Sequence, residues 1–185
     1  MQQDSVDRHI EHWITEIPDL DPFVEGITTR MHLLLKHLKQ QRHATIAARK
    51  LEDHEFDTLH MLGGCGPDHL ATPTEIAAWL HMSPAAITGR LDALERHGFV
   101  RRRPSPDDRR KVIVELTPAG RRIWRAAGSE QGAEEARIVG ALDHSEQQQL
   151  SALLRKMLLV VDRPELLATP KDVVRRGSKG RAKGG

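Results

Sequence analysis

Residues 72–120, TPTEIAAWLHMSPAAITGRLDALERHGFVRRRPSPDDRRKVIVELTPAG, decide the fold. They begin with Thr72-Pro73 and carry Glu75 three residues after the threonine, which is a capping box with proline at the first helical position. A second pair of cap and proline, Ser83-Pro84, follows soon afterwards. The stretch therefore predicts two short helices joined by a tight turn.

The second of these helices has an apolar face and a face of small or polar residues. Ile87, Leu91 and Leu94 recur at helical spacing, so we expect them in the core. Small side chains let a helix backbone approach DNA closely, so the opposite face suits a major groove, where Thr88 and Arg90 reach base edges or phosphates. The predicted DNA contacts of this helix are Ser83, Pro84, Ala85, Thr88 and Arg90.

A hairpin with a charged tip follows the second helix. One strand starts at Phe99-Val100, and the other alternates apolar residues with polar ones from Lys111 to Glu115. Residues 104–108, PSPDD, supply the turn. The pattern predicts a winged helix-turn-helix whose wing tip lies along a narrow minor groove. Its predicted DNA contacts are Arg103, Asp108, Arg109, Arg110 and Lys111, with Asp108 holding Arg110 extended.

Positive charge is concentrated around this hairpin. Residues 96–111 hold seven Lys or Arg against two Asp, although the formal net charge of the whole chain is only +2. The first 25 residues have the opposite sign, with seven acidic residues against one Arg. A charge run alone is often a solvated face, but this one follows two capped helices and therefore favours DNA binding.

Apolar stripes and caps predict further helices on both sides of this lobe. The first two run from Ser5 to Ile17 and from Asp21 to about Gln41, and a third starts at Ala44 or Leu51 and ends at Leu62. Two more helices are expected after the lobe, one starting at Thr117-Pro118 and one capped by Asp143 or Ser145. Gly128 and Gly132 disfavour helix in the middle of the first of these, so the sequence does not decide whether it is continuous.

The apolar faces outside the lobe exceed what one small lobe would bury, so we expect them to pack across a two-fold axis in a homodimer. The expected fold class is mainly α with a small β-hairpin wing and a helical dimerisation region. The expected divisions are N-terminal dimerisation helices (1–62), the winged lobe (63–117), C-terminal dimerisation helices (118–163) and a basic, disordered tail (164–185).

Composition excludes several classes of protein. With 38% hydrophobic and 29% charged residues, no apolar run approaches the ~20 residues of a membrane span. The N-terminus has no secretory signal, so we expect a cytoplasmic protein at the bacterial nucleoid. Histidine pairs such as His32 and His37 lack the spacing of metal ligands on one helix face, and no cofactor is expected. A DNA-associated enzyme is disfavoured because no catalytic motif is present.

The segments SPAAITGRLDALERHGFVRR, PDDRR and LTPAG closely resemble the multiple-antibiotic-resistance regulator (MarR) family of transcription factors, and the resemblance runs from about Asp21 to Val161. It implies a homodimeric, ligand-responsive regulator on a palindromic operator of double-stranded DNA, more often a repressor than an activator. It also implies an effector pocket between each lobe and the dimerisation helices. In that family the arginine of the D-x-R motif, here Arg110, contacts the minor groove.

A urate-responsive branch of the family has an added N-terminal helix and an Asp, Arg, Arg set, which this chain resembles at Trp13, Asp57, Arg90 and Arg102. The resemblance implies a pocket for a small planar anion such as urate or xanthine. Three alternatives remain open for the effector: a tricarboxylate such as citrate or aconitate, a phenolic compound, or a redox signal at Cys65. The four residues also admit purely structural roles.

Overall fold

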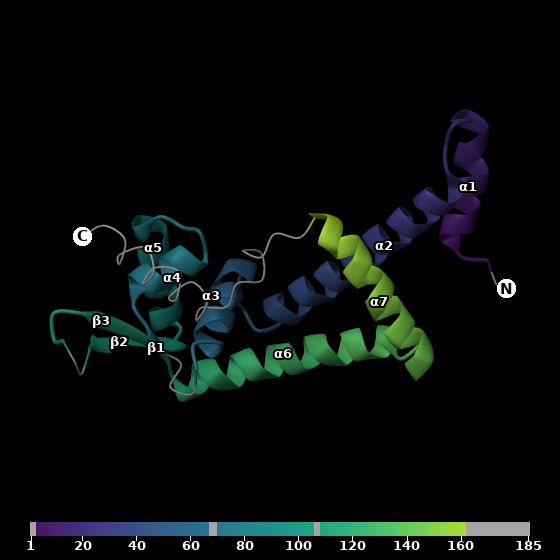
Figure 1. The fold of residues 1–185 in the computed structure, drawn as a ribbon. Helices are drawn as coiled ribbons and strands as arrows, with labels where there is room; N and C mark the ends of the chain where they lie inside the picture. The colour runs from purple at the N-terminus through teal and green to yellow at the C-terminus, as the bar shows by residue number, and fades with distance from the viewer. Residues whose placement is uncertain (1–2, 67–69, 106–107, 162–185) are drawn as a thin grey trace. The chain divides into compact units, whose positions relative to one another are not determined.

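The computed structural model describes residues 3–66, 70–105 and 108–161 (Figure 1). It confirms the predicted fold class, because the chain is mainly helical with one small antiparallel sheet. The predicted tail, 164–185, lies outside the described residues. Within the described ranges no helix combines the length and apolarity needed to cross a bilayer. The chain divides into two compact units, Met1–Ala44 and Thr45–Gly185.

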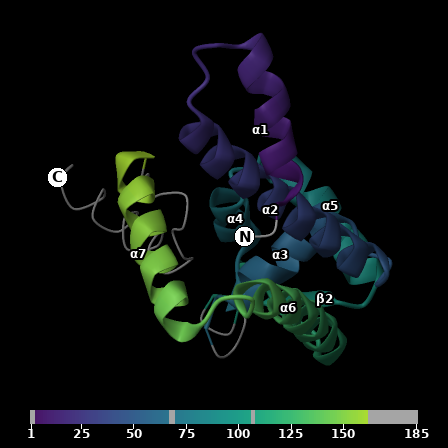
Figure 2. The ribbon, with the colours of Figure 1, turned by 90° about the vertical axis from the view of Figure 1, so that its right-hand side faces the viewer.

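The first unit contains α1 (Ser5–Glu16) and most of α2 (Pro22–Ala47), and the first half of α1 lies beside residues 25–30 of α2 (Figure 2). Asp4 caps α1 by accepting from the backbone N–H groups of Val6 and Asp7. Arg30 of α2 holds this cap, with Nε 2.9 Å from Asp4 Oδ2 and Nη2 2.5 Å from Asp7 Oδ1. The bond from Arg30 lowers the pKa of Asp4 to about 2.

Helix α2 is longer than the sequence predicts, since it continues past Gln41 to Ala47. No glycine or proline stands between these residues to end it. Helix α3 (Asp53–Gly63) then starts close to the later of the two candidate positions, two residues after Leu51. Its capping box joins Glu52 and Glu55, whose Oε2 accepts the Glu52 backbone N–H at 3.0 Å.

The second unit is built around one hydrophobic core. Helices α3, α4 (Pro73–Trp79) and α5 (Pro84–Arg96) each bury one apolar face in it. Both predicted caps are present, because Thr72 accepts from the Glu75 N–H and Ser83 accepts from the Ala86 N–H. The fully buried side chains include Leu59, Leu62, Ile76, Ile87, Leu91, Leu94, Val114 and Leu116.

The sheet has three strands, β1 (Leu70–Ala71), β2 (Val100–Pro104) and β3 (Val112–Leu116), in the order β1-β3-β2. The sequence does not predict β1, whose two residues are too short to show a pattern. The predicted alternation in β3 is wrong, because all four residues from Ile113 to Leu116 are buried. In this sheet β3 is covered on both faces from Ile113 to Leu116, so its sequence need not alternate there.

Helices α6 (Pro118–Val139) and α7 (His144–Val161) complete the second unit. Helix α6 is continuous through Gly128 and Gly132, and Thr117 caps it by accepting from the Gly120 N–H at 3.0 Å. The Thr117 hydroxyl also donates to the Gly98 carbonyl at 2.7 Å, which ties the start of α6 to the base of the hairpin. Helix α7 buries none of its residues within the single chain.

We predict opposite effects of two alanine substitutions in α6. A Cβ at position 120 would lie 2.0 Å from the carbonyl oxygen of Phe99, a backbone atom that cannot move aside cheaply, whereas a Cβ at position 128 meets open space. Gly120→Ala should therefore destabilise the fold by about 1–3 kcal/mol or more, and Gly128→Ala should stabilise it by up to about 1 kcal/mol. Urea unfolding followed by circular dichroism measures both, and equal effects of the two variants would contradict this packing.

Candidate nucleic-acid interface

The outer face of α5 is exposed and carries small side chains. Ser83, Pro84, Ala85 and Thr88 are all exposed, while the large apolar residues of the same helix, Ile87, Leu91 and Leu94, are buried. The Thr88 hydroxyl donates to the Pro84 carbonyl at 2.9 Å and keeps acceptor capacity toward solvent. A helix face without bulky side chains can enter a major groove, as the sequence predicts for it.

The lower part of the wing holds its arginines by ion pairs. Arg101 Nε donates to Glu115 Oε1, and Arg103 Nε donates to Glu115 Oε2 at 3.0 Å. Glu115 is only 7% exposed. Burial alone would raise the pKa of Glu115, but the bonds from Arg101 and Arg103 keep it below its ordinary value. Arg103, a predicted DNA contact, is thus anchored to the sheet.

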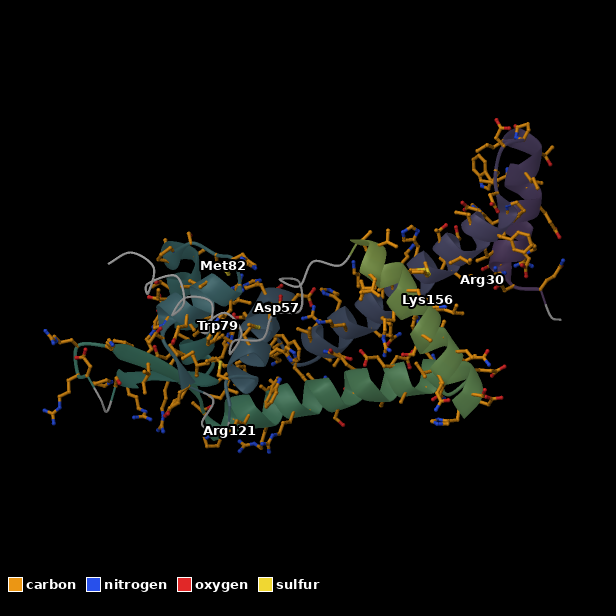
Figure 3. The ribbon with its side chains drawn as sticks, viewed as in Figure 1. Arg30, Asp57, Trp79, Met82, Arg121 and Lys156 are labelled. Atoms are coloured by element: carbon orange, nitrogen blue, oxygen red, sulfur yellow. The ribbon has the colours of Figure 1, made fainter. Side chains whose placement is uncertain are left out.

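The tip of the wing is different, because its cations face solvent. Arg109, Arg110 and Lys111 are exposed, and the side chain of Arg110 is 94% exposed. Asp108 Oδ1 accepts from the backbone N–H of Arg110 at 3.1 Å and lies 3.5 Å from its Nε. Figure 3 shows nitrogen-ended side chains reaching outward from the end of the β2–β3 hairpin. This arrangement presents positive charge to a phosphate backbone or a narrow minor groove.

Arg90 lies on another side of α5, in a shallow hollow beside α3. The hollow has a volume of about 420 Å³ and is lined by His54, Met82, Ala85, Ala86, Gly89, Arg90 and Ala93. Arg90 Nη1 donates to the buried hydroxyl of Thr58 at 3.4 Å. Burial lowers the pKa of Arg90, and the charges of Asp57 and Glu55 act against that shift. The structure thus brings Arg90 and Asp57 into electrostatic contact.

The other two residues of the predicted effector pocket have contacts of their own. Arg102 of β2 bonds to Asp92 and Glu95 of α5. Trp13 belongs to the first unit, where its 40% exposed side chain lies against the rings of His9 and His12. Sequence reasoning missed the carboxylates that hold the wing arginines. Their signals were an acidic pair three residues apart on α5 and a lone glutamate inside the apolar strand β3.

The surroundings of Cys65 keep its thiol protonated. The side chain is partly buried, and Sγ donates to the Met61 carbonyl at 3.0 Å. Burial raises the pKa of Cys65 to about 12, with a smaller contribution from the negative charge of Glu75. Within the described ranges, no cluster of three or more His, Cys, Asp or Glu side chains could hold a metal ion.

The fold and its basic face define a DNA-binding protein of the winged helix-turn-helix class. The model of the MarR family matches residues 51–112. The chain is 31% identical to the HTH-type transcriptional regulator PecS of Dickeya dadantii over 151 residues, which cover 80% of this chain and 89% of PecS. It is 30% identical to the transcriptional repressor MprA of Escherichia coli over 78% of this chain and 82% of MprA.

A similar solved structure is a mutant of MarR from Escherichia coli in complex with operator DNA. The two chains are 25% identical and superpose with a TM-score of 0.52. The match covers 76% of this chain and 99% of the MarR chain. This chain therefore belongs to the MarR family of transcriptional regulators.

We predict that the Cys65 thiol of the folded protein reacts slowly with iodoacetamide. Only the thiolate is nucleophilic, and a pKa of about 12 leaves very little of it at mildly alkaline pH. The folded chain should react about a hundredfold or more slower than the urea-unfolded chain, as measured by mass spectrometry over time. Similar rates in the two states would show an accessible, activated thiol and would restore the redox signal as an effector.

Proposed function

We propose that the chain acts as a homodimeric repressor that binds a palindromic operator and is released from it by a small anion. The observation that carries the DNA-binding part is the joint exposure of the small-residue face of α5 and the cations of the wing tip. The helix would lie in a major groove and Arg110 in the adjacent minor groove. The names of the relatives, which include a transcriptional repressor, support repression as the direction.

Exposed apolar surface supports a homodimer. Helix α7 presents Leu150, Leu153, Leu154, Met157 and Leu158 at 40–57% exposure, and buries nothing within its own chain. In the first unit, Phe23 is 81% exposed and Ile27 52% exposed. Exposed apolar faces of this extent are typical of interaction surfaces, and a second copy of the chain offers the same faces to cover them. Two identical lobes would then recognise two identical half-sites.

The hollow beside α5 supports a small anionic effector. Arg90 forms part of its lining and is held by Thr58, so a ligand bonded to its guanidinium would act directly on the DNA-facing helix. Asp57 would repel the same anion, so the bound anion would favour a conformation in which α3 has moved. The resemblance to the urate-responsive branch leads us to propose urate or a related purine such as xanthine as the ligand, and Trp13 and Arg102 as further contacts. Citrate or aconitate and a phenolic compound are the alternatives, and the raised pKa of Cys65 disfavours a redox signal.

We predict salt-dependent binding to a palindromic duplex recovered by repeated selection from a random library. The binding constant should fall steeply with salt, with a logarithmic slope of about −0.9 per neutralised phosphate. Arg110→Ala should weaken binding about tenfold, or roughly 1.4 kcal/mol. Arg137→Ala is the control, because this exposed arginine pairs with Glu134 on α6. Fluorescence anisotropy at several salt concentrations measures both, and an unchanged affinity of Arg110→Ala would remove the wing tip from the interface.

We predict that urate or xanthine releases the complex and that citrate does not. The planar anion should lower operator affinity at least tenfold. Trp13→Ala should bind DNA normally but need about tenfold more ligand, whereas Asp57→Asn, which no longer repels the anion, should bind it no more weakly but release DNA less completely. Titration of the protein–operator complex with each compound measures the response. Release by citrate alone would assign the pocket to a tricarboxylate. A wild type that no compound releases would rule out the anionic effector among these classes.

A further inference from the structure

Arg102 joins the wing strand β2 to α5 by two ion pairs and further hydrogen bonds. Its Nη1 lies 2.6 Å from Asp92 Oδ1 and 2.9 Å from Glu95 Oε2, and its Nη2 donates to the Thr88 carbonyl at 3.3 Å. Its backbone N–H donates to the other oxygen of Glu95, Oε1, at 3.0 Å. Every acceptor belongs to α5, and Arg102 belongs to the wing strand β2. We call this set the α5–wing brace.

The position of β2 explains why the brace forms at this residue. β2 is an edge strand, because the sheet order is β1-β3-β2, so one side of its backbone has no neighbouring strand. Glu95 satisfies the N–H that Arg102 presents on this side. Side chains alternate along a strand, so Arg101 and Arg103 reach Glu115 on one face while Arg102 reaches α5 on the other.

The geometry requires an arginine. A planar guanidinium can donate to two carboxylates and a carbonyl at the same time, whereas an ammonium group has no such fork. The Arg102 side chain is only 25% exposed, less than the 53% of Asp92 and the 39% of Glu95. Both of its terminal nitrogens donate to α5, whereas the side chain of Arg110 at the wing tip is 94% exposed.

We infer that Arg102 is a positioning residue that fixes the wing against α5, so that the wing tip and the outer face of α5 meet the same duplex. It does so through Asp92, Glu95 and the Thr88 carbonyl, and it does not itself contact DNA. This inference rests on the proposed DNA binding. Loss of the brace would leave the core intact, since none of its side chains is part of the hydrophobic core. It would free the hairpin to move relative to the helix.

The direction in which operator affinity changes when acidic residues are removed distinguishes the brace from simple charge repulsion. The double variant Asp92→Ala/Glu95→Ala removes two negative charges close to the proposed DNA face. If these carboxylates only repel phosphate, operator binding should tighten. If they hold the wing, binding should weaken about tenfold and its salt slope should fall, because the tip cations no longer reach their phosphates.

A matched control carries the same change of charge on α6, namely Glu134→Ala/Glu135→Ala. It should leave operator affinity within about twofold of the wild type and keep the salt slope. Urea unfolding of both double variants checks that they fold. Tighter binding by Asp92→Ala/Glu95→Ala, in a protein whose wild type binds the operator, would overturn the brace. A wild type that binds no selected duplex would instead overturn the proposed function.

A mutant cycle gives a second test that a general loss of stability would not imitate. Arg102→Gln and Arg110→Ala are made singly and together. If Arg102 positions the wing, the operator affinity of the double variant should lie within about twofold of that of the weaker single variant. In the control cycle, Arg101→Gln replaces Arg102→Gln, because Arg101 pairs with Glu115 and not with α5. In this control cycle the fold-losses of operator affinity caused by Arg101→Gln and Arg110→Ala should multiply. Multiplying effects in the Arg102 cycle would overturn the positioning role.

Discussion

Three carboxylates hold three consecutive arginines, and the DNA-facing half of the molecule depends on this arrangement. Arg101, Arg102 and Arg103 would repel one another on an isolated hairpin. The fold separates them by strand alternation, with Glu115 taking the first and third and α5 taking the second. The base of the wing is thereby close to neutral and fixed. The net positive charge of the wing is left at the tip, where a duplex can reach it.

The features of this fold that depend on residues close in sequence could be predicted from the sequence. The caps at Thr72, Ser83 and Thr117 and the apolar spacing of α5 depend on neighbours within a few residues, so the winged fold was predictable. The two-residue strand β1 was not, because it exists only through pairing with β3. The same holds for the partners of Arg102. Asp92 and Glu95 resemble an ordinary polar face until the register of β2 places an arginine opposite them.

Arg90 shows why a residue type alone does not assign a role. Sequence reasoning assigns it both a DNA contact and an effector contact, since a cation at that position of a recognition helix suits either. In the structure its guanidinium is turned toward α3, bonded to Thr58 and partly desolvated, whereas Ser83 and Thr88 are exposed and do not line the hollow. This geometry favours the hollow over the groove. A small anion there would meet a cation whose hydration is already partly lost, which strengthens the pairing.

The two arginines of the proposed effector set are therefore not equivalent. An anion that bonds only to Arg90 leaves the α5–wing brace in place and acts by shifting α3 against α5. An anion that also draws in Arg102 must displace Asp92 and Glu95, whose carboxylate oxygens compete for the same guanidinium. A ligand changes a conformational equilibrium only by its difference in affinity between the states. The second route supplies that difference directly, because the ligand and the DNA-competent wing require the same donors of Arg102.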